Sequence, residues 1–356
     1  MLRARFAAFV LTLLPALLPA ADLRTRNVIL VTTDGLRWQD LFHGIDPLLA
    51  REKSAHMDST DKDAEERRRR FDNRIALAPF FWLNLAKNGV VLNNVNVTNA
   101  FRVSYPGYSE ILTGRASDDI IKGNDPIQQP NETVLEFLRT KLSLSMERVA
   151  LFSSWNHFTY IGEHAPGAIF INAGYRQVVG SAAEKRLMEL GDMQFLAQTP
   201  RDEARHDVFT FELALEHMKW KKPRILMISF DETDDWAHAK RYDRVLDMIH
   251  TTDGFLSRLW TTIQSMPEYR DSTTLIVTSD HGRGSTLADW SDHGSKVQGA
   301  DKIWIAIRGP DTPGSGEIST HAEQRDIAPT IIKLMGLNPA DYKGATGKPI
   351  ESAFKP

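Results

Sequence analysis

The sequence predicts a three-layer α/β/α sandwich around a mostly parallel central sheet. Short, continuous apolar runs rich in β-branched residues, such as Asn27–Thr33 and Thr273–Ser279, alternate along the chain with segments of helical pattern. Runs without polar alternation are typical of parallel strands that are buried on both faces. We find no internal repeat and no obvious linker, so residues 22–356 are expected to form one domain.

The individual elements follow from the same patterns and from helix start and stop signals. A helix is expected to begin near Pro79 and to end at Asn88-Gly89, and a shorter one to follow Pro106 and close at Thr113-Gly114. Further helical patterns cover 132–142, 182–196, 202–220 and 240–264. Strands are expected at 27–33, 90–97, 148–152, 224–230, 273–279 and 302–308.

The N-terminus reads as a secretory signal. Two arginines among the first five residues precede the apolar run Phe6–Leu18 and the small residues Ala20 and Ala21. The alternative is an N-terminal membrane anchor, but the run is shorter than the roughly 20 residues that span a bilayer. We therefore expect residues 1–21 to be a cleaved signal peptide, and the mature protein to be secreted or periplasmic with no stable membrane anchor.

Composition excludes several classes of function. Hydrophobic residues make up 42% of the chain and charged residues 25%, which is typical of a globular protein rather than a disordered one. The net charge of −3 gives no basic excess, so we expect no nucleic acid as a standing partner. The chain has no cysteine, so no thiol can act as nucleophile or metal ligand. The charge-dense segment 51–74 is interpreted as an exposed helix or an insertion without catalytic chemistry.

Carboxylates and imidazoles follow three of the predicted strands. Asp34 comes directly after the first, and Asp280-His281 after the strand at 273–279. Asp234 and His238 follow the strand at 224–230 and are four residues apart, so on a helical turn they face the same way. An acidic helix start with an unrelated histidine is the alternative for that pair. Parallel strands present their carboxyl ends at one sheet edge, where ligands bind.

Two further polar residues complete the predicted site. Ser104, in Val103-Ser104-Tyr105-Pro106-Gly107, is expected at a strand-to-helix turn, near a helix N-terminus that favours anions. A turn or cap serine is the alternative. Asn124 lies in a loop, where a simple turn residue is equally compatible with the composition. Aspartate and histidine without thiolate suit Zn²⁺, with Mn²⁺ as the alternative, and two such ions can act together in phosphoryl transfer.

Together these motifs resemble the alkaline phosphatase superfamily, which includes alkaline phosphatases, nucleotide pyrophosphatase/phosphodiesterases, sulfatases and cofactor-independent phosphoglycerate mutases. The resemblance covers nearly the whole mature chain and implies an alkaline-phosphatase-like catalytic domain with two divalent metal ions. It implies one metal bound by Asp34, Ser104, Asp280 and His281, and another bound by Asp234, His238 and His293. His321 is the alternative to His293, which we prefer because the strand after it ends in Gly-Pro.

The resemblance also implies a function, namely hydrolysis of small-molecule phosphate mono- or diesters with Ser104 as nucleophile. Asn124 is then expected to stabilise a phosphoryl oxygen. Sulfatases of the family have Arg at the place of Tyr108, which argues against sulfatase activity. A sulfatase-like or phosphonate hydrolase and a catalytically inactive metal-binding relative remain as alternatives. We expect the substrate pocket to be walled by residues 42–76 and by the loop after Trp155.

Overall fold

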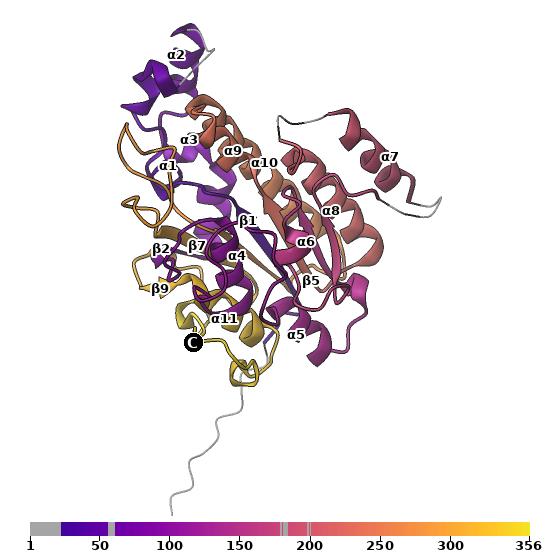
Figure 1. The fold of residues 1–356 in the computed structure, drawn as a ribbon. Helices are drawn as coiled ribbons and strands as arrows, with labels where there is room; N and C mark the ends of the chain where they lie inside the picture. Colours follow the sequence, from indigo (N-terminus) through magenta and orange to yellow (C-terminus); the bar gives the residue numbers. More distant parts are fainter. Residues whose placement is uncertain (1–22, 56–60, 179, 181–183, 198, 200) are drawn as a thin grey trace, which may run out of the picture.

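The computed structural model describes residues 23–356 apart from 56–60, 179, 181–183, 198 and 200 (Figure 1). The predicted signal peptide lies outside these residues. Among the helices that are described, none combines the length and the apolar character that crossing a bilayer requires.

One central sheet organises the described chain. Its strand order is β4-β3-β5-β1-β6-β7-β2-β8, and β9 pairs with β2. Strand β1 lies in the middle, parallel to β5 on one side and to β6 on the other, whereas β7 runs antiparallel to both of its neighbours. The strands are β1 (Asn27–Thr33), β2 (Val90–Asn96), β3 (Val149–Ser153), β4 (Phe170–Ala173), β5 (Ile225–Phe230), β6 (Thr273–Ser279), β7 (Lys302–Arg308), β8 (Gly316–Ile318) and β9 (Ala322–Glu323).

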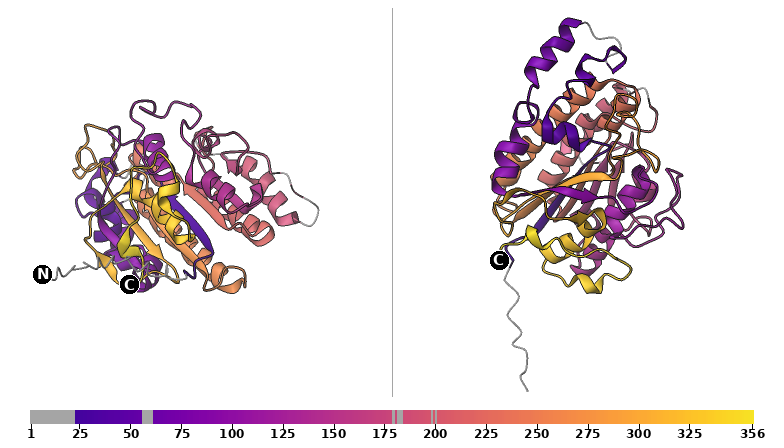
Figure 2. Two further views of the ribbon diagram at one scale, coloured as in Figure 1. Left: turned by 90° about the horizontal axis from the view of Figure 1, so that it is seen from below. Right: turned by 90° about the vertical axis from the view of Figure 1, so that its left-hand side faces the viewer.

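Helices cover both faces of this sheet, as the sequence predicts (Figure 2). Strand β1 shows why, because Ile29 and Val31 belong to one hydrophobic core while Val28 and Leu30 belong to the other. The α-helices are α1 (Trp38–His43), α2 (Asp61–Arg70), α3 (Arg74–Leu77), α4 (Ser104–Thr113), α5 (Val134–Lys141), α6 (Phe158–Ile161), α7 (Lys185–Met193), α8 (Asp207–Lys221), α9 (Glu232–His238), α10 (Tyr242–Ser265) and α11 (Ile327–Leu334), with a π-helix at Phe81–Ala86.

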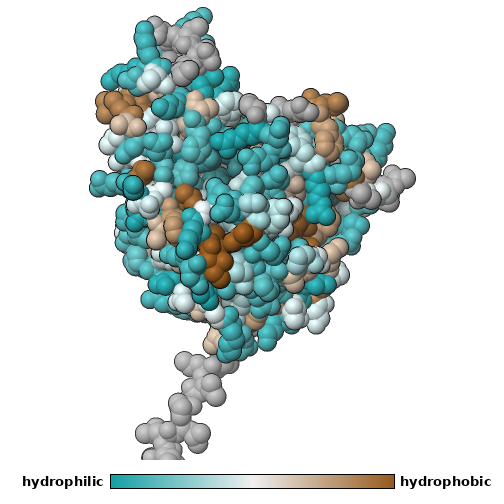
Figure 3. Space-filling model, in the orientation of Figure 1, coloured by the Kyte–Doolittle hydropathy of each residue, from teal (hydrophilic) through white to brown (hydrophobic). Residues whose placement is uncertain are grey.

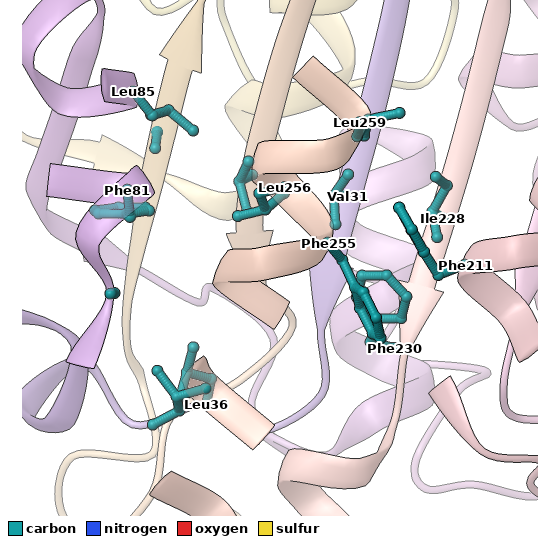
Figure 4. Close-up of a cluster of buried hydrophobic side chains, with 14 of the residues drawn as sticks. Val31, Leu36, Phe81, Leu85, Phe211, Ile228, Phe230, Phe255, Leu256 and Leu259 are labelled. Atoms are coloured by element: carbon teal, nitrogen blue, oxygen red, sulfur yellow. The ribbon is translucent and has the colours of Figure 1, made fainter. Parts of the chain in front are cut away.

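Aromatic and branched side chains join the layers on the face that α8 and α10 cover (Figure 4). The ring of Phe255 on α10 stacks on Phe211 of α8 with centroids 4.5 Å apart, and lies 5.5 Å from the ring of Phe230 on β5. This core fixes the helices against β5, whose carboxyl end carries part of the site. The outer surface is mostly hydrophilic in the view of Figure 3, with small scattered hydrophobic areas.

Three details differ from the sequence predictions. The helix expected at 202–220 begins only at Asp207, because the Arg205 guanidinium turns inward and donates to Thr210 Oγ1 at 2.8 Å and to Asn172 Oδ1 at 2.6 Å. The helix near Pro79 is of π type over Phe81–Ala86. The short strands β4, β8 and β9 were not predicted, since their few residues have no distinctive apolar run.

Candidate metal and phosphoryl-transfer site

The site forms where β5, β1 and β6 end together. Thr33 is in register with Phe230 on one side and with Ser279 on the other, so the residues that follow these strands share one sheet edge. Asp34 follows β1 and Asp280 follows β6. The sequence predicted this shared edge from the three apolar runs alone, because parallel strands order their carboxyl ends in this way.

A first group of donors surrounds Ser104. Its hydroxyl Oγ lies 3.3 Å from Asp34 Oδ1 and 3.4 Å from His281 Nε2. Ligand atoms of Asp34, Asp280 and His281 all lie within 4.8 Å of one another. All four residues are buried, with no more than 5% of each residue exposed. The structure therefore brings together the four side chains that the sequence assigned to one metal.

A second group lies directly beside the first. Asp234 Oδ2 lies 3.2 Å from His238 Nε2, and the Nε2 atoms of His238 and His293 are 3.1 Å apart. The imidazole rings of His281 and His293 stack with centroids 4.0 Å apart, and His281 Nε2 is 4.0 Å from Asp234 Oδ1. The three residues that the sequence assigned to the second metal thus meet as well, and His281 is the side chain that links the groups.

Backbone carbonyls fix the tautomers of two histidines. His281 Nδ1 lies 3.0 Å from the Gly282 oxygen, and His293 Nδ1 lies 3.2 Å from the Arg102 oxygen. A carbonyl can only accept, so each Nδ1 carries the proton and donates it. In the neutral imidazole each Nε2 then has its lone pair toward the site, which is the usual arrangement of metal-binding histidines. Arg102, whose oxygen accepts from His293, has a φ of 54°, in the left-handed region.

Close packing of α4 places Ser104. The helix begins at Ser104, so the hydroxyl lies in its first turn, where free backbone N–H groups favour an anion. Gly107 lies one turn later against the backbone after β6, and a Cβ at this position would be only 2.4 Å from the Asp280 carbonyl oxygen. A glycine is needed here because any side chain would push the helix, and Ser104 with it, away from Asp280 and His281.

Tyr108 and Asn124 support this end of the site. The buried Tyr108 hydroxyl donates to Asp34 Oδ2 at 3.1 Å, so a tyrosine holds a candidate ligand at the place where sulfatases have Arg. Asn124 is exposed, and its Oδ1 accepts from the backbone N–H of Tyr105 at 2.9 Å. The amide Nδ2 of Asn124 remains to donate to a ligand beside Ser104.

The pKa values of the site residues are shifted because several carboxylates are buried close together. Burial and the nearby Asp34 charge raise the pKa of Asp280 to about 8. Burial lowers the pKa of His281, but the Asp280 and Asp34 carboxylates outweigh this effect and raise it to about 9. Burial lowers the pKa of His293 and of His238, so both are neutral at pH 7.

The donor set fits divalent cations. Asp280 Oδ1 accepts from the Gly35 N–H at 2.9 Å, whereas its buried Oδ2 accepts no hydrogen bond from any residue that the structure describes. A buried carboxylate oxygen in this state is costly unless a cation neutralises it. Oxygen and imidazole donors together suit Zn²⁺ or Mn²⁺. Each of the two groups could hold one ion.

One residue of the site was missed at the sequence level. Arg283 is 1% exposed, and its Nη2 contacts Asp234 Oδ1. Its Nε donates to the Gly35 carbonyl oxygen at 2.9 Å, and its Nη1 donates to the Ser291 carbonyl oxygen. Arg283 therefore ties the loops after β1 and β6 to α9. The available signal was its position directly after Asp280-His281-Gly282, a motif that turns off a buried strand.

His321, the alternative ligand, is exposed and lies in the loop between β8 and β9. His293, in contrast, belongs to a group with Asp234 and His281 whose ligand atoms lie within 4.8 Å of one another. The geometry therefore favours His293 for the second metal.

Comparison with known proteins gives a family match over part of the chain and several similar folds. A family model described as "Metalloenzyme superfamily" matches residues 202–339. The solved structure of wild-type alkaline phosphatase PafA matches 94% of this chain and 100% of its own with a TM-score of 0.58 at 11% identity. The fold is similar to that of this alkaline phosphatase. The resemblance inferred from the sequence motifs is thus confirmed for the fold.

Two further solved structures have a similar fold. Phosphonate monoester hydrolase of Agrobacterium radiobacter has a TM-score of 0.56 and 15% identity, with 93% of this chain and 78% of that chain covered. The structure "BT4656 in complex with its substrate D-Glucosamine-2-N, 6-O-disulfate" has a TM-score of 0.52 and 14% identity, with 93% and 82% covered. At these identities the likeness concerns the fold.

Curated sequence relatives are 2,3-bisphosphoglycerate-independent phosphoglycerate mutases. The protein from Gracilaria tenuistipitata var. liui is 21% identical over 208 residues, which are 58% of this chain and 37% of that protein. The protein from Haloarcula marismortui is 22% identical over 225 residues, 63% of this chain and 39% of that protein. The chain spans less than two fifths of the length of these relatives. At 21% and 22% identity over part of each protein, these relatives show a likeness of sequence, and their activity is said of them alone.

Proposed function

We propose that this protein is a metal-dependent phosphoric ester hydrolase with Ser104 as its nucleophile. The observation that carries the proposal is the position of the Ser104 hydroxyl, within 3.4 Å of Asp34 Oδ1 and of His281 Nε2 and beside the second donor group. An isolated turn serine has no need of such neighbours. A nucleophile for phosphoryl transfer does, because its hydroxyl is weak until its proton is withdrawn.

The residues of the two donor groups would have the following roles in the reaction. Asp34, Ser104, Asp280 and His281 would hold one divalent ion, and Asp234, His238 and His293 the other. Such ions supply Lewis-acid stabilisation of phosphoryl oxygens and lower the pKa of a hydroxyl or water beside them. We infer Zn²⁺ as the native metal, with Mn²⁺ as the alternative, and export to the periplasm or medium as the location.

Ser104 Oγ donates to Asp34 Oδ1 in the present geometry, so this carboxylate is the first acceptor of the hydroxyl proton. Oγ then attacks phosphorus, the bond to the ester oxygen breaks, and the alcohol leaves with a proton from water. A water molecule next hydrolyses the phosphoserine and restores the hydroxyl. The first turn of α4 and the Asn124 Nδ2 group are placed to stabilise negative charge on phosphoryl oxygens.

The test is a hydrolysis panel on metal-loaded protein, with 4-nitrophenyl phosphate, bis-4-nitrophenyl phosphate and 4-nitrophenyl sulfate as substrates. We expect turnover of at least one phosphate ester and a loss of at least a thousandfold in kcat for Ser104→Ala. Ser315→Ala, at an exposed serine in the loop between β7 and β8, is the matched control and should keep wild-type rates. Full activity of Ser104→Ala would refute the nucleophile, and sulfate preferred over both phosphates would favour the sulfatase-like alternative.

A further inference from the structure

A hollow of about 270 Å³ adjoins the second donor group. Trp236, His238 and Ala239 contribute to its wall from the last turn of α9 and the residue after it. The other wall comes from the segment before α8. The lining residues are Thr199, Arg201, His206, Glu232, Asp235, Trp236, His238 and Ala239.

A series of contacts within the site connects this hollow to Ser104. Ser104 contacts His281, His281 faces Asp234, and Asp234 contacts His238, which lines the hollow. A different hollow of about 380 Å³, the hollow at the Ser104 end, is lined by Val103 and Asn124 beside Ser104 and also by His293 of the second donor group. The hollow at Trp236, which we call the Trp236 hollow, meets the site at His238 and is not lined by the residues around Ser104.

We propose that the Trp236 hollow receives the leaving alcohol of the substrate, and that this alcohol is a compact, uncharged aromatic or similarly flat ring. The inference rests on the proposed function. In phosphoryl transfer the attacking and leaving oxygens lie roughly in line on opposite sides of phosphorus. With Ser104 as attacker, the leaving oxygen faces the second donor group, and its substituent extends past His238 into the hollow.

The residues that line the Trp236 hollow favour a flat apolar ring as the leaving group. Trp236 is partly buried and packs against the hydrophobic core, so its indole is held in place. Its apolar surface and the Ala239 methyl group offer contact to a flat apolar group, which aromatic rings favour through offset or edge-to-face packing. The volume suits a compact group rather than a large one, since sites for drug-sized ligands start at about 300 Å³.

The charged groups at the rim are already paired. Arg201 Nη1 lies 2.7 Å from Asp235 Oδ1, and His206 Nδ1 lies 3.0 Å from Glu232 Oε1. Each basic side chain of the segment before α8 thus has a carboxylate of α9 as its partner, and the hollow has no need of a charged group from the substrate. The segments 42–76 and the loop after Trp155, from which the sequence predicted the pocket walls, do not line this hollow.

The experiment compares two phosphate monoesters that differ in the leaving group, phenyl phosphate and methyl phosphate, by phosphate release from metal-loaded protein. For Trp236→Ala we expect kcat/KM for phenyl phosphate to fall on the order of tenfold, and kcat/KM for methyl phosphate to change less than twofold. Trp236→Phe should keep most of the activity on phenyl phosphate. Calorimetric binding of phenyl phosphate to Ser104→Ala, with and without Trp236→Ala, gives a readout without turnover and should show the same loss.

Two further variants test whether an effect of Trp236→Ala comes from misfolding or from a change that is not specific to the leaving group. Ala239→Phe adds a ring at an exposed position, fills the hollow and should lower turnover of phenyl phosphate only. Phe101→Ala removes an aromatic ring from the hollow at the Ser104 end and should affect both substrates by the same factor.

The outcomes separate the two proposals. If wild-type protein hydrolyses phosphate esters and Ser104→Ala does not, but Trp236→Ala and Ala239→Phe treat both substrates alike, the leaving-group inference alone is overturned. If the wild type turns over no phosphate ester, the proposed function fails and the inference fails with it.

Discussion

Replacing Gly107 by alanine tests whether the close approach of α4 to the end of β6 sets the geometry of the site. The added Cβ would lie 2.4 Å from the Asp280 carbonyl oxygen, whereas ordinary contact begins at 3.4 Å. Helix and loop must therefore separate by about 1 Å, and Ser104 moves with the helix. Misplacement of a reacting group by about 1 Å can cost roughly a hundredfold in rate. We expect a loss of that size in kcat/KM.

The stability of the same variant should change much less. Overpacking costs about 1–3 kcal/mol, and the better helix propensity of alanine offsets about 1 kcal/mol of this. The matched control is Gly254→Ala in the middle of α10, where the described residues place no atom within 4 Å of the new Cβ apart from the neighbouring backbone of the helix itself. It should stabilise the protein by about 1 kcal/mol and leave turnover unchanged. Steady-state hydrolysis and calorimetric melting measure both effects, and wild-type kcat/KM in Gly107→Ala would refute the reasoning.

Three further predictions concern the donors and their supports. Asp280 and His281 have raised pKa values in the folded, metal-free protein and bind protons more tightly than in the unfolded chain, so their contribution to its stability should fall as pH rises from about 4 toward 9. His293 and His238, whose pKa values are lowered, act in the opposite direction below the ordinary histidine pKa, so melting in chelator between pH 7 and 9 measures this fall. Added Zn²⁺ should stabilise most at the alkaline end, and a flat profile in chelator would contradict the prediction. Arg283→Met should weaken metal binding tenfold or more, measured by competition with a chelator, because its carboxylate partner loses its anchor; unchanged affinity would assign Arg283 no part in the site. Tyr108→Phe removes the hydrogen bond to Asp34 and should destabilise the metal-free protein by about 2 kcal/mol in denaturant unfolding, whereas an effect below 0.5 kcal/mol would show that water replaces the hydroxyl.

The pattern of apolar strands in the sequence was sufficient to predict most of the fold and the positions of the principal donors. Asp34 and Asp280-His281 follow apolar runs directly, and this local arrangement predicts their common place at a parallel sheet edge. The spacing of Asp234 and His238 likewise predicts one face of a helix, which α9 provides. His293 lies in a loop, and its preference over His321 came from the family resemblance rather than from spacing.

The start of α8 shows where local pattern was insufficient. The residues before Asp207 are compatible with a helix by propensity, but the buried Arg205 side chain bonds to acceptors on β4 and α8. These acceptors are brought together only by the tertiary fold. Propensity is a weak prior that such contacts override.

The sequence by itself predicted the α/β class and the carboxylates and histidine that follow the strands directly, because each is encoded within a few neighbouring residues. Tertiary structure alone decided that Gly107 packs on Asp280, that Arg283 anchors Asp234, and that a hollow opens beside Trp236. These features join segments that are distant in the chain. Their distances depend on how helices pack on the sheet, which side-chain volumes in the whole core determine together.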